Sequence, residues 1–235
     1  MKNFMKALYM MLCCILTLAL AACGNTETGG NETQPPVNSE TNNTSEETPS
    51  PSGADTSTNG DTKTLVVYFS MPDNVDDSTV VIDGETLGNS QYMAYVIQEN
   101  TEGDIFRILP ETPYTTDHDE LVDLAKKEQQ NNARPKIKDT IEDFGSYDTV
   151  FVGYPNWWGD MPMILYTFFD TYDFSGKIII TFNTHGGSGF SGTNQTITEL
   201  EPNATVTEGL SISRNDIEDA EADIVDWLKG LGYAK

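Results

Sequence analysis

The stretch Val150-Phe151-Val152-Gly153-Tyr154-Pro155-Asn156-Trp157-Trp158-Gly159-Asp160-Met161-Pro162 decides how we expect this chain to fold. Its first part, residues 150–153, is a short apolar run of the kind that forms a strand buried on both faces of a parallel sheet. The Gly and Pro residues that follow predict a turn, and this turn holds two adjacent Trp side chains. Large aromatic side chains on a turn at the end of a strand are poorly placed to fill a core, so we predict that they line a flat ligand.

Apolar runs rich in β-branched and aromatic residues alternate along the chain with helix-like patterns. The predicted strands are residues 65–69, 105–109, 150–154, 178–182 and 205–212. The predicted helices are residues 90–100, 117–131, 162–171, 191–200 and 215–231. Strict alternation of strands and helices implies right-handed crossovers around a parallel sheet, so the predicted class is α/β.

The last predicted helix carries a clear apolar stripe. Its apolar residues recur at helical spacing, namely Ile217, Ala220, Ile224, Leu228 and Leu231. Ser213, with Asp216 three residues later, predicts a capping box where this helix begins.

The first 23 residues have the pattern of a targeting segment. Lys2 and Lys6 precede an apolar run, residues 7–20, which is too short to span a membrane comfortably. The residues that follow, Leu20-Ala21-Ala22-Cys23, resemble the lipobox of bacterial lipoproteins, in which the Cys is lipidated and becomes the new N-terminus. We therefore predict a signal peptide over residues 1–22 and a lipid anchor on Cys23 at the outer face of the bacterial cytoplasmic membrane. The alternative is an ordinary secretory signal with a chance Cys.

Residues 23–62 are predicted to be a tether. After Cys23 they are rich in Thr, Asn, Glu, Ser, Gly and Pro, with too few apolar side chains to offset the entropy of ordering. A flexible chain of about 40 residues has a typical reach of about 30–40 Å. Because Cys13 and Cys14 would leave with the signal, the mature chain keeps Cys23 alone, which excludes a disulfide and a thiol nucleophile.

Residues 63–235 are predicted to form one acidic domain. They hold 30 Asp and Glu against 11 Lys and Arg, which is most of the net charge of −24. This charge excludes nucleic acid and anionic membrane surfaces as partners, so membrane contact is expected through the lipid anchor only. It favours a basic redox partner protein, although a solvated surface with no partner explains the charge equally well.

Ligands of open parallel sheets bind outside the carboxyl ends of the strands. Ser70 follows the first predicted strand, then comes an acidic stretch, residues 71–87, and then Gly88, Asn89, Ser90 and Gln91 begin a helix. Free N–H groups at a helix N-terminus favour an anion, so we predict an anion site here, made without Lys or Arg. The alternative is a helix cap without a ligand.

The loop after the fourth predicted strand is rich in glycine. Its backbone amides can approach a ligand closely, although a flexible surface loop has the same composition. An anion site, an aromatic wall and a polar rim at one crevice are together what flavin mononucleotide (FMN) requires.

These three loops resemble those of the flavodoxin family. Ser70 with residues 88–94 resembles the family's phosphate loop and first helix, residues 154–162 resemble its ring-stacking loop, and residues 184–189 are similar to its third flavin loop. Residues 120–137, with Tyr147-Asp148, resemble a subgroup that includes bacterial envelope lipoproteins. The resemblance covers residues 63–235.

The resemblance implies a three-layer α/β/α fold with a five-stranded parallel sheet of order 2-1-3-4-5 and non-covalent FMN. Ser70, Asn89 and Ser90 would bind the phosphate, helped by the amides of Gly88 to Gln91. Trp157 and Trp158 would stack on or edge the flavin ring. Tyr154, Pro155 and Asn156 would shape the turn, and the Gly159 peptide would reorient when the flavin gains a proton. The pyrimidine edge would meet the third loop, whose residues are Thr184, His185, Gly186, Gly187, Ser188 and Gly189.

The acidic stretch 71–87 departs from the family pattern as an insertion that splits the phosphate loop. Its carboxylates lack the spacing of a calcium loop, so we expect a solvated lid and no metal site. His118 is expected on the surface of an exposed helix. His185 is expected at the flavin rim, where a structural role and a hydrogen bond to the ring are both open.

The function predicted from these features is electron transfer by a membrane-tethered FMN protein outside the cytoplasmic membrane. An acidic domain and stacked Trp rings would lower the flavin's reduction potential. One alternative is an FMN-dependent reductase of quinones or similar small planar acceptors. The second is a non-redox surface binding lipoprotein that keeps the fold without the flavin.

Overall fold

The computed structural model describes residues 63–71, 73 and 78–234. The predictions for the signal peptide, for Cys23 and for the tether up to residue 62 fall outside these residues. Among the residues described, no helix has the length and apolar character needed to cross a bilayer.

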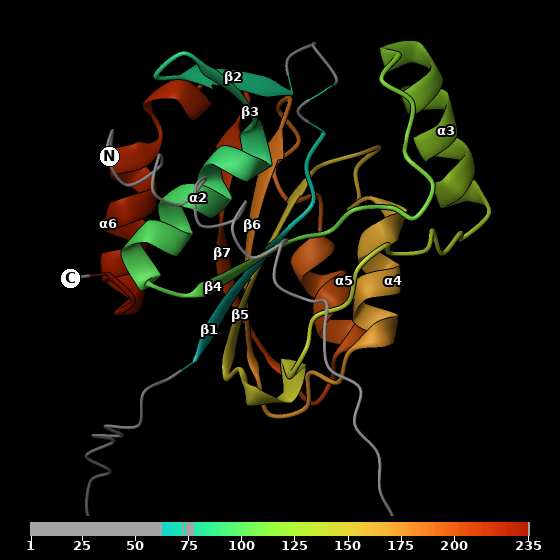
Figure 1. Ribbon diagram of the computed structural model, residues 1–235. Helices are drawn as coiled ribbons and strands as arrows, with labels where there is room; N and C mark the ends of the chain where they lie inside the picture. The colour runs from blue at the N-terminus through green and yellow to red at the C-terminus, as the bar shows by residue number, and fades with distance from the viewer. Residues whose placement is uncertain (1–62, 72, 74–77, 235) are drawn as a thin grey trace, which may run out of the picture. The chain divides into compact units, whose positions relative to one another are not determined.

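A five-stranded parallel sheet forms the centre of the domain (Figure 1). Its strands are β1 (Thr64–Tyr68), β4 (Asp104–Arg107), β5 (Thr149–Pro155), β6 (Ile178–His185) and β7 (Thr205–Ser213). They lie in the order β4-β1-β5-β6-β7, and every neighbouring pair is parallel. Numbered along the chain, this is the order 2-1-3-4-5, so the predicted fold class and strand order are confirmed.

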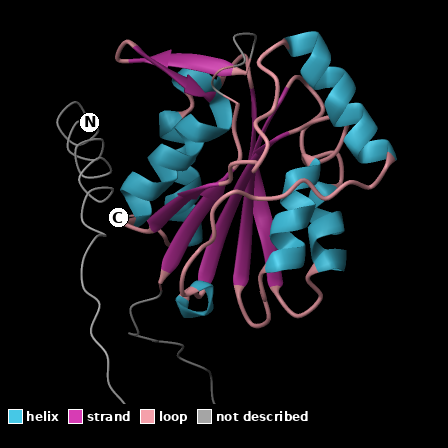
Figure 2. Ribbon diagram, turned by 45° about the vertical axis from the view of Figure 1, so that its right-hand side comes forward, coloured by secondary structure: helices cyan, strands magenta, loops and turns pink. Residues whose placement is uncertain are grey.

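Helices cover both faces of the sheet (Figure 2). On one face lie α2 (Asn89–Thr101) and α6 (Glu221–Leu231), and on the other lie α3 (His118–Gln130), α4 (Met163–Thr171) and α5 (Thr193–Leu200). Each face has its own apolar core. Val150, Val152 and Tyr154 of β5 pack toward α4 and α5, whereas Phe151 packs toward α2 and α6. The sheet is therefore buried on both faces, as the continuous apolar runs predict.

The acidic insertion contains an antiparallel hairpin that the sequence analysis did not predict. β2 (Thr79–Ile82) pairs with β3 (Glu85–Gly88), and the two turn residues have positive φ, 51° at Asp83 and 84° at Gly84. Two-residue hairpin loops favour this geometry, which an Asp-Gly pair adopts readily. Val80 and Leu87 are buried against the core that α2 and α6 share. The expected solvated lid is exposed at Asp83, Gly84, Glu85 and Thr86, but Val80 and Leu87 anchor it to the core; residues 72 and 74–77 of the stretch lie outside the described residues.

The predicted start of the last helix was also wrong. β7 continues through Ser213, and a short 3-10 helix (Ile217–Asp219) precedes α6, which begins at Glu221. Ser213 Oγ accepts a hydrogen bond from the Asn215 N–H at 3.2 Å, so it supports a turn and does not cap a helix. The predicted apolar stripe is confirmed for four of its five residues, since Ile217, Ala220, Ile224 and Leu228 are buried.

Candidate functional site

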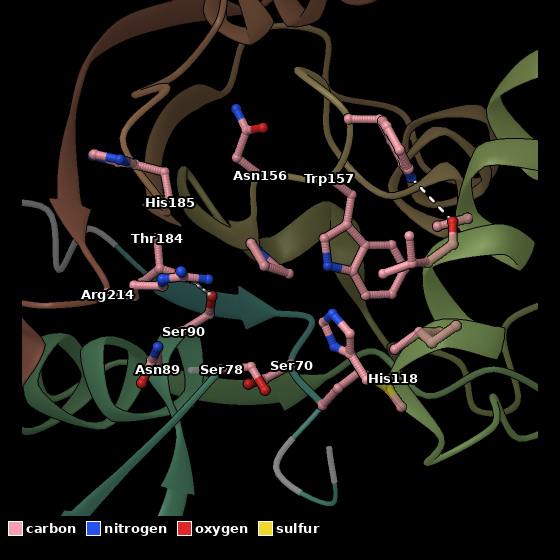
Figure 3. A pocket seen from close by; sticks show the side chains of 17 residues that line it. Ser70, Ser78, Asn89, Ser90, His118, Asn156, Trp157, Thr184, His185 and Arg214 are labelled. Atoms are coloured by element: carbon pink, nitrogen blue, oxygen red, sulfur yellow. Dashed lines mark hydrogen bonds between the residues drawn. The ribbon is translucent and has the colours of Figure 1, made fainter. Parts of the chain in front are cut away.

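A pocket of about 480 Å³ opens at the carboxyl ends of the central strands (Figure 3). All three predicted loops contribute to it: Ser70, Asn89 and Ser90 from the first, residues 155–158 from the second, and residues 184–186 from the third. Parallel strands end on the same edge of a sheet, which is why residues far apart in sequence meet here.

Seven of the predicted site residues lie outside the lining of this pocket. Tyr154 is fully buried in the core, where its hydroxyl lies 2.7 Å from Thr193 Oγ1. Gln91 supports the start of α2, because its Oε1 accepts a hydrogen bond from the Gly88 N–H at 3.2 Å. The others are Gly88, Gly159 and Gly187, which are next to lining residues, and Ser188 and Gly189 farther along the third loop.

The start of α2 forms the polar side of the pocket. Ser90 Oγ and Thr184 Oγ1 are 2.9 Å apart and both residues are buried, so this hydroxyl pair joins α2 to the end of β6. The Asn89 N–H donates to the Ser78 carbonyl at 2.8 Å. Two amides of the predicted anion site, those of Gly88 and Asn89, therefore bind protein acceptors. At the start of α2 itself, the hydroxyl groups and the helix dipole are left to favour an anion.

The two adjacent Trp residues have different surroundings. Trp158 and Gly159 have positive φ, 56° and 75°, and the Trp157 N–H and the Asp160 N–H each donate to the other residue's carbonyl, at 2.8 and 3.1 Å. This two-residue turn requires φ values that Gly adopts easily. The Trp157 ring is half-buried and lies edge-on to Phe69, with centroids 5.4 Å apart, and Figure 3 shows it beside the pocket.

Trp158 lies at the pocket mouth against α3. Its Nε1 donates to the Val122 carbonyl at 3.1 Å, and Lys126 Nζ lies 4.5 Å from the ring centroid. The side chain remains 48% exposed. Trp157 is therefore the better placed of the two rings to face a ligand inside the pocket, while Trp158 also holds a helix.

Asn156 ties the second loop to the third. Its Nδ2 donates to the Gly189 carbonyl at 2.9 Å, and its Oδ1 accepts from the Gly159 N–H at 3.1 Å. Asn183, buried at the end of β6, donates to the same Gly189 carbonyl at 3.0 Å. The sequence analysis did not select Asn183, although it immediately precedes the predicted third loop. The Gly-rich loop is thus held at several points, including a bond from the Gly187 N–H to His185 Nδ1 at 2.8 Å.

Two basic side chains that the sequence analysis did not assign to the site also line the pocket. His118 begins α3 and is exposed, as predicted; it also lines the pocket, and Figure 3 shows its ring next to Trp157. Arg214 follows β7, and its backbone N–H donates to the His185 carbonyl at 2.9 Å. The end of the fifth strand lies on the same edge of the sheet as the other loops, so strand position alone could have indicated Arg214. Apolar residues of α3 complete the wall, namely Leu121, Val122 and Ala125.

Tyr114 and Glu128 form a partly buried pair behind Trp157. The Tyr114 hydroxyl donates to Glu128 Oε2 at 3.1 Å, and its ring centroid is 6.0 Å from that of Trp157. Burial raises the pKa of Tyr114 well above its usual value, and the neighbouring carboxylate raises it further. Burial also raises the pKa of the Glu128 carboxyl. Tyr114 therefore stays a protonated donor that supports the back of the Trp157 ring.

Solved structures with the same fold include flavoproteins. A candidate flavoprotein from Bacteroides eggerthii DSM 20697 matches with a TM-score of 0.58 and 29% identity, over 72% of this chain and 98% of that chain. A second, from Bacteroides uniformis ATCC 8492, matches with a TM-score of 0.55 and 25% identity, over 72% of this chain and 98% of that chain.

A third structure, from Lactobacillus acidophilus NCFM, is a flavoprotein in complex with FMN. It has a TM-score of 0.50 and 22% identity, over 67% of this chain and 97% of that chain, and at that identity the likeness shows the fold alone. No curated protein matches this chain. The family model described as flavodoxin matches residues 79–230. Since that match covers more than half of the 235 residues, and the strand order agrees with it, the chain belongs to the flavodoxin family.

Proposed function

We propose that the pocket binds FMN non-covalently and that the domain transfers electrons to a redox partner protein. The observation that carries the proposal is that one pocket joins the buried hydroxyl pair at the start of α2 to the Trp157 ring. FMN has a phosphate at one end and a planar ring system at the other. The hydroxyl pair suits the phosphate, and the Trp157 ring suits the planar ring system. The volume of about 480 Å³ also lies within the range of cofactor pockets.

Different residues of the pocket would bind different parts of FMN. Ser90, Asn89 and the α2 dipole would hold the phosphate, and Trp157 would pack on the ring. Bound FMN supplies one- and two-electron chemistry that the side chains lack. Gly159 has no side chain and a φ of 75°, so its peptide could turn toward a ligand proton if the hydrogen bond of 3.1 Å from its N–H to Asn156 Oδ1 opened. The rest of the turn is held by the bonds between Trp157 and Asp160.

The location of this activity is a separate part of the proposal. We propose that Cys23 anchors the protein by lipid outside the bacterial cytoplasmic membrane, and the support is the sequence pattern of residues 1–23. The acidic surface of the domain favours a basic partner protein, whose association would weaken as salt is added.

A second candidate function is reduction of a quinone or similar small planar acceptor. The observation that favours it is the apolar wall of α3, where Leu121 and Ala125 are buried and line the same pocket as Trp157. Such a wall could accept a flat apolar molecule beside the cofactor. Turnover separates the two functions: a reductase consumes quinone catalytically in the presence of an electron donor, whereas a carrier reoxidises fastest with a basic redox protein at low salt.

The test of the proposal is flavin binding by the full chain. We expect a flavin absorption spectrum from the purified protein or, after removal of bound flavin, quenching of Trp emission when FMN is added. The chain has three Trp residues, of which Trp227 lies on α6, away from the pocket. Trp157→Phe should weaken the affinity for FMN, and the matched Trp227→Phe should leave this affinity unchanged. A colourless protein that FMN cannot reconstitute would exclude both redox functions and favour the non-redox binding lipoprotein.

A further inference from the structure

Arg214 lies at the pocket because of the register between two strands. β6 and β7 pair in parallel with His185 opposite Ser213, so the residue after β7 meets the third loop. The Arg214 N–H donates to the His185 carbonyl, and a Cβ built on Gly186 would lie 3.5 Å from Arg214 Cζ. The guanidinium therefore lies beside Gly186, at van der Waals distance from a Cβ at that position.

The pocket differs in charge from the rest of the chain. The sequence has 37 Asp and Glu against 13 Lys and Arg. Among the described residues that line the pocket, however, none is Asp or Glu, and Arg214 is the one with a permanent charge. Carboxylates would repel an anionic ligand and an Arg attracts one, so this distribution favours an anion in an otherwise acidic domain.

Arg214 faces the polar side of the pocket. Figure 3 shows its guanidinium with Thr184, Ser90 and Asn89, whereas Trp157 and His118 lie on the other side. Thr184 precedes His185 in β6 and its hydroxyl is 2.9 Å from Ser90 Oγ, which ties these groups to one place. A guanidinium presents several N–H donors in a planar fork that matches the oxygens of a phosphate.

We propose that Arg214 binds the phosphate of the flavin cofactor and makes the pocket select FMN over riboflavin, an inference that rests on the proposed function. This changes the expectation of an anion site made without Lys or Arg. Arg214 is exposed at the pocket mouth, so its attraction for phosphate is screened by salt. We therefore expect the lower end of the range for a charge-assisted contact, which is about a 10-fold gain in affinity.

The experiment titrates flavin-free full-length protein with FMN and with riboflavin, at low and at high salt. In Arg214→Gln the affinity for FMN should fall about 10-fold, and the affinity for riboflavin should stay unchanged. Arg214→Lys, which keeps the charge but loses the fork, should give an intermediate affinity for FMN. Added salt should weaken FMN binding to the wild type more than to Arg214→Gln.

The matched control is Arg134→Gln, which removes the same charge from a residue that pairs with Asp170 outside the pocket lining. It should leave both flavin affinities unchanged. Equal losses for FMN and riboflavin in Arg214→Gln, or no loss for either, would overturn the inference while leaving flavin binding intact. A wild-type protein that binds neither flavin would instead overturn the proposed function, and the role of Arg214 with it.

Discussion

The indole Nε1 of Trp158 donates a hydrogen bond of 3.1 Å to the Val122 carbonyl and so joins the turn after β5 to α3. The same turn is joined to α3 a second time, since Gln129 Nε2 donates to the Trp158 carbonyl at 3.3 Å. α3 buries only Leu121 and Ala125, so it has little core of its own among the described residues. The wall of the pocket on this side therefore depends on Trp158.

We predict that Trp158→Phe loosens α3 without loosening the sheet. Phe keeps an aromatic ring for Lys126 but has no N–H for the Val122 carbonyl. A lost hydrogen bond costs about 0.5–1.5 kcal/mol, so amide hydrogen exchange in α3 should become about 2- to 12-fold faster. Hydrogen exchange followed by mass spectrometry would measure this. Unchanged exchange in α3 would contradict the prediction, and equally faster exchange in β1 and β5 would show a global effect instead.

Gly153 in β5 is predicted to be intolerant of any side chain. A Cβ at this position would overlap the ring of Phe182, which is fully buried in the neighbouring strand. Overpacking in a closed core costs about 1–3 kcal/mol, and occasionally more. Gly153→Ala should therefore lower the free energy of unfolding by about 1–3 kcal/mol or more. Urea denaturation would measure the loss.

The control for this change is Gly145→Ala, because a Cβ on Gly145 meets no heavy atom within 4 Å. Its free energy of unfolding should change by no more than about 0.5 kcal/mol. Similar losses in the two variants would mean that the Phe182 contact does not limit residue size at Gly153.

Asn156 is predicted to fix the position of the turn after β5 relative to the loop after β6. Asn156→Asp keeps the acceptor for the Gly159 N–H but puts a carboxylate oxygen against the Gly189 carbonyl, where Nδ2 now donates at 2.9 Å. It also adds negative charge to a pocket lining that has none among the described residues. Together these effects should weaken FMN binding roughly 10- to 100-fold. Flavin titration would measure this, with Asn131→Asp at the exposed end of α3 as the equal-charge control; matching losses in the two variants would refute a local role for Asn156.

The sequence predicts well those parts of the fold that depend on local pattern. The apolar run of β5 alternates between two cores, with Val150 and Val152 on one face and Phe151 on the other. Its Gly and Pro residues place the turn with Trp157 at the strand's carboxyl end, and this is where the pocket opens. These features follow from side-chain burial and backbone preference, which act within a few residues.

Other features depend on contacts between distant segments. Arg214 lies at the pocket because β7 pairs with β6. His118 lies there because Trp158 joins α3 to the turn after β5. Neither residue has a local motif that marks it as a ligand. The hairpin is a different case: its β-branched residues and its Asp83-Gly84 pair were present in the sequence, and the surrounding acidic residues obscured them.

Glu201, at the end of the sheet opposite the pocket, is predicted to make stability fall as pH rises. Burial, with Asp173 and Asp170 nearby, raises the pKa of its carboxyl to about 7. Between its unfolded pKa near 4.5 and that value, the folded chain holds a proton that the unfolded chain has released, so stability falls as pH increases through this range. Glu201→Gln cannot ionise, so at pH 8 it should have a higher Tm than the wild type, and below pH 4.5 the two Tm values should converge. Thermal unfolding from pH 4 to 8 measures this, with the exposed neighbour variant Glu199→Gln as control. A Tm difference between Glu201→Gln and the wild type that stays constant over this pH range would show that the Glu201 carboxyl titrates alike in the folded and unfolded chains.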